Sequence, residues 1–87
     1  MKPKLSINQY GKWWTLPNGE LHREDGPAIE TSDYKAFYIN GELHREDGAA
    51  VELRKGTKYW FLNGIEYTEK NYKIEMRSKK LNKLLNH

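Results

Sequence analysis

An eleven-residue block that occurs twice is the feature of this sequence that most constrains its fold. The two copies span residues 18–28 and 40–50, and they differ at one position, where the first has Pro27 and the second has Ala49. A partial third copy begins at Asn63-Gly64, so the spacings between copies are 22 and 23 residues. Such self-similarity is typical of an array in which one structural unit repeats and neighbouring units bury each other's apolar faces.

Two turn signals in each block predict a β-hairpin unit. Asn-Gly between β-rich runs favours a type I′ hairpin turn, because both residues tolerate a positive φ. Pro17 lengthens the first of these turns, so we expect its geometry to differ. Asp-Gly, later in each block, predicts a second chain reversal. The residues of this structural turn motif are Asn18, Gly19, His22, Arg23, Asp25, Gly26, Asn40, Gly41, His44, Arg45, Asp47, Gly48, Asn63 and Gly64.

Short strand-like segments flank these turns and predict an antiparallel meander. The aromatic-led runs before each Asn-Gly are residues 14–16, 37–39 and 60–62. Because every connection is short, we expect each strand to pair with its neighbour in the sequence. The first hairpin would pair residues 5–9 with 12–16 and turn at Tyr10-Gly11. The β-hairpin array of about two and a half units should occupy residues 4–67 of a single mainly β domain.

The third copy abandons the block where a C-terminal helix is predicted. Tyr67, Thr68 and Lys70 stand where the full copies have His, Arg and Asp. We expect a basic capping helix over residues 68–86 with Thr68 as its N-cap. The apolar residues that recur at helical spacing are Ile74, Leu81, Leu84 and Leu85. This stripe should lie across the last hairpin, on either its Trp60/Leu62 or its Tyr59/Phe61 face.

At these residues a family resemblance becomes specific. The pattern aromatic-aromatic-Leu/Ile-Asn-Gly-x-Leu-His-Arg-Glu-Asp-Gly-Pro-Ala, over about residues 13–70, resembles short repeats of phage, giant-virus and bacterial proteins. It is similar to variants of the MORN repeat. The resemblance implies an all-β repeat sheet and, by association, a phage origin. The second block departs from it at Ala49, and the Gly-rich positions of standard MORN units are thin here.

The residue types of the His-Arg-Glu-Asp segment are ones that also occur in catalytic and metal-binding sites. His22 with Asp25, and His44 with Asp47, could serve acid–base catalysis or bind a metal. Alternatively, they satisfy backbone groups of the tight loop. We favour the structural role, because catalytic groups are usually unique whereas structural devices repeat, and we predict no enzyme activity, metal or cofactor. The chain also has no cysteine. The arginines of the blocks could bind phosphate or carboxylate, but pairing with their own acidic neighbours is favoured.

Two surfaces are candidates for binding a partner. The candidate partner-binding aromatics are Trp13, Trp14, Tyr34, Tyr38, Tyr59 and Trp60. They cannot all face one core, because alternate strand residues point to opposite sides, so some form an exposed face or lie beneath the helix. The candidate basic surface is Lys70, Lys73, Arg77, Lys79, Lys80 and Lys83. These residues could follow a nucleic-acid backbone or dock an acidic protein surface, or they could form the solvated face of a capping helix.

The sequence therefore predicts a non-catalytic protein-binding module. If the resemblance to phage proteins holds, an inhibitor of a bacterial defence system such as a CRISPR effector is its specific form, acting in the host cytoplasm. The alternatives are a nucleic-acid-binding protein and a structural, self-assembling repeat protein. No apolar run approaches the ~20 residues that a membrane-spanning helix needs, so we expect no membrane partner. We expect a cytoplasmic monomer or homodimer.

Overall fold

The computed structural model describes residues 2–85 of the chain, and the side chains of residues 2–83. In chain order the elements are β1 (Lys4–Asn8), β2 (Gly11–Thr15), β3 (Ile29–Thr31), β4 (Tyr34–Ala36), β5 (Tyr38–Ile39), β6 (Glu42–Leu43), β7 (Val51–Leu53), β8 (Lys58–Leu62), β9 (Ile65–Tyr67) and α1 (Glu69–Leu85). The predicted mainly β fold with a C-terminal helix is confirmed. The last predicted helical position, residue 86, lies outside the described residues.

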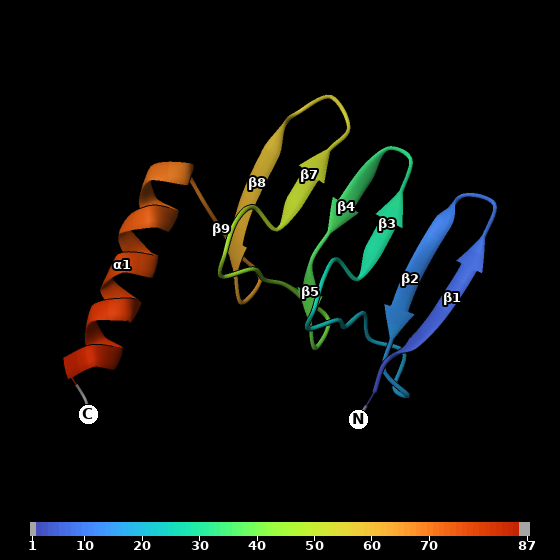
Figure 1. Cartoon of the computed structure of the whole chain (residues 1–87), viewed down its shortest axis with the longest axis horizontal. Helices are drawn as coiled ribbons and strands as arrows, with labels where there is room; N and C mark the ends of the chain where they lie inside the picture. The colour runs from blue at the N-terminus through green and yellow to red at the C-terminus, as the bar shows by residue number, and fades with distance from the viewer. Residues whose placement is uncertain (1, 86–87) are drawn as a thin grey trace.

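The main sheet is a single antiparallel layer of seven strands in the order β1-β2-β3-β4-β7-β8-β9. Figure 1 shows the hairpins β1–β2, β3–β4 and β7–β8 side by side, with α1 standing at the end of the row. The molecule measures 46 × 33 × 17 Å, so it is thin in the direction across the sheet. The array is therefore an extended surface rather than a sandwich.

Strand pairing departs from a strict meander in the second unit. Strand β4 pairs with β7, while β5 and β6 form a separate two-stranded sheet around Asn40-Gly41. The reason is a set of hydrogen bonds to the preceding block. The backbone N–H of Gly41 donates to the carbonyl of Leu21, and that of Arg23 donates to the carbonyl of Tyr38. This hairpin thus bonds to the loop before it instead of extending the main sheet.

The Asn-Gly turns have the backbone geometry that the sequence predicts. At Asn40 and Gly41 the φ values are 49° and 82°, and at Asn63 and Gly64 they are 52° and 79°. Positive φ at both central residues is the requirement of a type I′ turn. The first turn differs, as Pro17 indicated, because only its glycine, at φ 89°, has a positive φ.

The N-terminal hairpin turns one residue earlier than expected, at Gln9-Tyr10 rather than Tyr10-Gly11. The side chain of Asn8 causes this shift. Its Oδ1 accepts hydrogen bonds from the backbone N–H groups of Tyr10 at 2.8 Å and Gly11 at 3.2 Å. Gly11 instead lies in β2 against β3, where a Cβ would clash with the Glu30 carbonyl oxygen.

Helix α1 has the predicted N-cap, but the side of the helix that faces the sheet is not the predicted one. Oγ1 of Thr68 accepts a hydrogen bond from the backbone N–H of Asn71 at 3.1 Å. The expected packing of the apolar stripe is wrong, because Ile74 and Leu81 are 56% and 55% exposed. The side chains of Leu84 and Leu85 lie outside the described residues. Tyr72 makes the buried contact instead, and α1 packs against β8 and β9.

The buried core is small and consists mainly of alanine. Its apolar members are Ala28, Ala36, Ala49, Ala50, Leu62 and Tyr72. Because alanine is small, the loops of the blocks can approach the sheet closely. Among the described residues, no helix combines the length and the apolar character needed to cross a bilayer.

Candidate functional site

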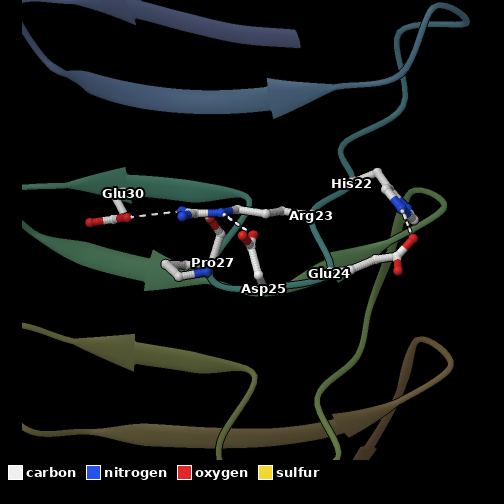
Figure 2. Close-up of polar contacts among 6 residues, drawn as sticks. All are labelled: His22, Arg23, Glu24, Asp25, Pro27 and Glu30. Carbon is white, nitrogen blue, oxygen red and sulfur yellow. Dashed lines mark hydrogen bonds and ion pairs between the residues drawn. The ribbon is translucent and has the colours of Figure 1, made fainter. Parts of the chain in front are cut away.

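The arginine of the first block is bound by its own loop and by the sheet. Nε of Arg23 donates to Oδ1 of Asp25 at 2.9 Å, and Nη1 donates to the carbonyl of Pro27 at 3.1 Å. Nη1 also lies 3.3 Å from Oε1 of Glu30 on β3. The guanidinium stacks on Trp14, 3.8 Å from the ring centre. Figure 2 shows Arg23 extended toward Glu30, with Asp25 and Pro27 beside it. The predicted pairing of the arginine with acidic neighbours is therefore observed.

The histidine of the first block joins two repeat units. The backbone N–H of Asn40, in the second block, donates to Nδ1 of His22 at 2.9 Å. Because Nδ1 accepts this bond, the proton of the neutral ring must be on Nε2. Nε2 lies 3.2 Å from Oε2 of Glu24, and Figure 2 shows the two side chains facing each other. His22 therefore binds a backbone group of the next unit rather than of its own tight loop, which was the predicted role, and Asp25 binds Arg23 rather than the backbone of its turn.

The second block repeats this arrangement. The partners of Arg45 are Asp47, the Ala49 carbonyl, Glu52 and the Phe37 ring, at 2.9, 3.0, 3.3 and 3.9 Å. His44 accepts a hydrogen bond from the backbone N–H of Asn63 at 2.9 Å, and its Nε2 lies 3.1 Å from Glu46. Over residues 2–85, no three His, Asp or Glu side chains converge as metal ligands would. In both blocks the histidine connects one unit to the next, and the arginine holds its own loop to the sheet.

Tyr72 joins α1 to the second block by hydrogen bonds. Its hydroxyl donates to the carbonyl of Arg45 at 2.6 Å and accepts from the backbone N–H of Gly48 at 3.3 Å. Burial raises the pKa of the Tyr72 hydroxyl. The hydrogen bond from Gly48 opposes this shift, and the charge of Asp47 adds to it. The neutral hydroxyl is therefore the form that the folded chain favours.

A row of alternating charges crosses one face of the main sheet. The residues that stand directly opposite one another on β2, β3, β4, β7 and β8 are Lys12, Glu30, Lys35, Glu52 and Lys58. We call them the charged row, and the face that carries them the charged face. Opposite-charge pairs in this position stabilise a sheet by about 0.2–1 kcal/mol each. Because Arg23 and Arg45 reach the two glutamates of the row, the loops of the blocks lie on this face.

The opposite face of the same five strands is apolar. Trp13, Ile29, Ala36, Val51 and Tyr59 stand opposite one another there, and Tyr34 pairs with Leu53 beside them. We call Trp13, Ile29, Tyr34, Val51, Leu53 and Tyr59 the apolar face. In the described chain the block loops bind the charged face and α1 stands at the end of the row, so neither covers the apolar face (Figure 1). Tyr59 is exposed, and the other five side chains are half-buried.

The structure divides the six candidate aromatics among three places. Trp13, Tyr34 and Tyr59 share the apolar face, and Tyr59 is the most exposed of them. Trp14 and Trp60 are on the charged face, because each lies two residues from a member of the charged row. The sixth, Tyr38, pairs with Leu43 in the small sheet. Burial raises the pKa of Tyr38, and the neighbouring Tyr34 adds to that shift.

The six candidate basic residues are all exposed on α1 or at its start. Four of them line an open groove of about 1500 Å³ between α1 and the loops of both blocks, namely Arg77, Lys79, Lys80 and Lys83. The same groove is lined by four carboxylates, Glu24, Asp25, Glu46 and Asp47. Lys73 is paired with Glu69 at 3.2 Å. The groove is therefore of mixed charge, and only part of the basic surface is free of acidic neighbours.

Several residues that hold the block loops and α1 in place were not predicted from the sequence. Glu30 and Glu52, the sheet partners of the two arginines, follow them by seven residues in both copies, and this shared spacing was an available signal. Phe37, the ring beneath Arg45, begins an aromatic-led run as Trp14 does. No pattern in the sequence marks Tyr72, because its partners belong to a loop more than twenty residues away.

Comparison with known proteins leaves the family open. No protein-family model matches this chain, and no curated protein or solved structure matches it. The resemblance to MORN-type repeats of phage proteins thus stays a prediction. The fold and the site rest on the residues described above.

Proposed function

We propose that this chain is a non-catalytic protein-binding module that docks a partner protein on the apolar face. The observation that carries the proposal is the cross-strand register, which brings Trp13, Tyr34 and Tyr59 together with three aliphatic side chains on one uncovered face. Monomeric proteins rarely expose large contiguous apolar patches, and those that they do expose often bind a partner. Aromatic side chains in the centre of such patches are the usual anchors of protein interfaces.

The repeated blocks support this function because they hold the face in one shape. Each histidine bonds one unit to the next, and each arginine ties its loop to a glutamate of the sheet. A surface that is rigid before binding loses less conformational entropy when a partner docks. The engagement of these side chains within the chain also supports a structural rather than catalytic role for the His-Arg-Glu-Asp segments.

The specific form of the proposal is an inhibitor that occludes a surface of a bacterial defence protein, such as a CRISPR effector. The support for this form is the resemblance of the blocks to repeats of phage proteins. Expression of the chain in a bacterium that defends itself with such an effector should restore plaque formation by the targeted phage. No change in plaque number across several defence types would refute this form and leave the docking face to be tested separately.

A pair of matched double variants tests the docking face. A partner captured from host lysate is first identified and purified, and its affinity is then measured by calorimetry. The double variant Tyr34→Ser/Tyr59→Ser removes two rings from the apolar face on β4 and β8. Loss of such anchors typically costs at least about 1–2 kcal/mol each, or roughly tenfold in affinity. The control Lys35→Ser/Lys58→Ser changes the same two strands on the charged face and should leave the affinity within about twofold.

If the control variant loses more affinity for the partner than the Tyr34→Ser/Tyr59→Ser variant, the proposal is overturned.

The alternative function, nucleic-acid binding by α1, is favoured by the exposure of all six basic residues. The four carboxylates of the groove oppose it, because they would repel a phosphate backbone there. Changing Lys73, Arg77, Lys79 and Lys80 to Glu should abolish DNA or RNA binding if this alternative holds. Unchanged binding, or none in the unaltered chain, would exclude it.

A further inference from the structure

The two edge strands of the seven-stranded sheet differ in length and in whether another element packs beside them. At one edge β9 has three residues, and α1 packs beside it. At the other edge β1 has five residues, and in the described chain its only pairing partner is β2. Leu5 and Ile7 of β1 are 43% and 68% exposed. Open edge strands usually carry charges or bulges that prevent pairing with another chain, whereas the centre of β1 is Leu5-Ser6-Ile7.

The hydrogen bonds of β2 show which backbone groups of β1 are free to pair. Trp14 uses its N–H for the carbonyl of Ala28 and its carbonyl for the N–H of His22, so both groups point away from β1. Residues directly opposite one another in an antiparallel pair either exchange both bonds or both point outward. Leu5 is opposite Trp14, so the N–H and the carbonyl of Leu5 point to the open edge. Ile7, two residues further on, does the same.

The open edge of β1 can pair with the same edge of a second copy of the chain. If two copies of β1 pair antiparallel about Ser6, Leu5 of each copy stands opposite Ile7 of the other. Each of these pairs exchanges both of its backbone hydrogen bonds, so every outward-pointing group of Leu5 and Ile7 is satisfied. A shift of two residues is worse in either direction. One shift places Pro3, which has no N–H, opposite Ile7, and the other places Gln9 of the turn opposite Leu5.

The positions of the Leu5 and Ile7 side chains also favour the pairing about Ser6. Leu5 is on the charged face opposite Trp14, and Ile7 is opposite Lys12, so both aliphatic side chains project on that side of the sheet. Pairing about Ser6 brings the Leu5 and Ile7 side chains of both copies into one cluster. Lys4 would stand opposite Asn8 of the second copy, so the two lysines do not oppose each other across the junction.

We infer that the β1 edge is a homodimer interface, through which two copies of this chain join their sheets into one continuous antiparallel sheet. The two-fold axis passes between the paired Ser6 residues, perpendicular to the sheet. Both copies of the apolar face therefore lie on the same side of the joined sheet. This inference does not depend on the proposed function, and it predicts that a partner docked on that face meets two identical sites side by side.

Sedimentation velocity over a wide range of protein concentration tests the interface. We expect the mass to rise with concentration from the 10.3 kDa of one chain toward twice that value. Ile7→Lys should remain monomeric at every concentration, because it places a charge in the apolar cluster. Ile65→Lys, a change of an exposed aliphatic residue at the other edge, should dimerise like the unaltered chain. Circular dichroism establishes that both variants are folded.

A second variant and a residue-level measurement cover the case in which Ile7→Lys does not fold. Ile7→Pro removes an outward N–H without breaking a hydrogen bond to β2, a change that an edge strand tolerates, and it should also prevent dimerisation. In the unaltered chain, hydrogen exchange at the amides of Leu5 and Ile7 should slow as protein concentration rises, whereas that at Ile65 should not change. An unaltered chain that stays monomeric, a dimer unaffected by both Ile7 variants, or exchange at Leu5 and Ile7 that is independent of concentration would each overturn the inference.

Discussion

The two faces of the main sheet are formed by the same strands but differ in what their side chains contact. On the charged face, arginines from both blocks stack on aromatic rings and bind glutamates of the charged row. Among the described residues, no arginine stacks on a ring of the apolar face. Trp13 and Trp14 illustrate the contrast, since these neighbours point to opposite faces and only Trp14 lies beneath an arginine. Stability and binding should therefore be separable by changing alternate residues of one strand.

Arg45→Ala should have the largest effect on stability among single changes on the charged face. It leaves the Ala49 carbonyl and Glu52 without their donor and uncovers the Phe37 ring. We expect the free energy of unfolding to fall by about 2–4 kcal/mol, as measured by chemical denaturation. The control Arg54→Ala, at an exposed turn residue, should change it by less than about 0.5 kcal/mol. Equal losses in the two variants would show that the block loops do not stabilise this face.

His22→Phe should have the next largest effect. The substitution keeps a ring of similar size but removes the acceptor of the Asn40 N–H, and because this bond is partly buried we expect a loss of about 1–2 kcal/mol. Hydrogen exchange at the Asn40 amide should accelerate in this variant. Glu24→Ala, at the exposed end of the same hydrogen-bond chain, should cost less than about 1 kcal/mol. If Glu24→Ala costs as much as His22→Phe, the bond between the repeat units is not the important one.

Tyr72→Phe should destabilise the chain by about 1 kcal/mol, because it removes the hydroxyl that binds the second block. Burial raises the pKa of this hydroxyl above its usual value of 10.0. The stabilisation is therefore complete below pH 10 and is lost as pH rises through the raised pKa. Unfolding measured at neutral and alkaline pH should show the difference between the two chains shrinking at high pH. A difference that stays constant would contradict the role of the neutral hydroxyl.

Lys35→Glu should have the smallest effect of the four. It places a carboxylate between Glu30 and Glu52 in the charged row, and we expect a loss of about 0.5–1 kcal/mol. The loss should decrease at high salt, because these side chains are at the surface. Lys55→Glu, in the turn between β7 and β8, should show neither the loss nor its salt dependence. A loss that salt does not alter would mean that alternating charge does not distinguish this face.

Two of the turns and the helix cap could be predicted from the sequence, whereas the first hairpin turn could not. The turns at Asn40-Gly41 and Asn63-Gly64, and the cap at Thr68, were predictable because φ preferences and caps depend on a few adjacent residues. The turn at Gln9-Tyr10 was missed, because the side chain of Asn8 competes for the same backbone groups.

The candidate site was only partly predictable. Alternation along each strand separates Trp13 from Trp14 without any structure. Placing Tyr34 and Tyr59 beside Trp13 requires the register of β2, β3, β4, β7 and β8, and this register depends on pairing between distant segments. The β5–β6 hairpin was predicted, but its separation from the main sheet was missed for the same reason, since its partners lie in the preceding block.

The sequence by itself determined the repeating unit, its type I′ turns and the place where the array ends in a helix, because these follow from local backbone preferences repeated along the chain. The tertiary structure decided which face of the sheet stays bare and which side of α1 is buried. Both depend on bonds between residues far apart in sequence, such as His22 to Asn40 and Arg45 to Tyr72. A hydrogen bond of this kind is formed only after the chain has brought its two groups together, so no local pattern specifies it.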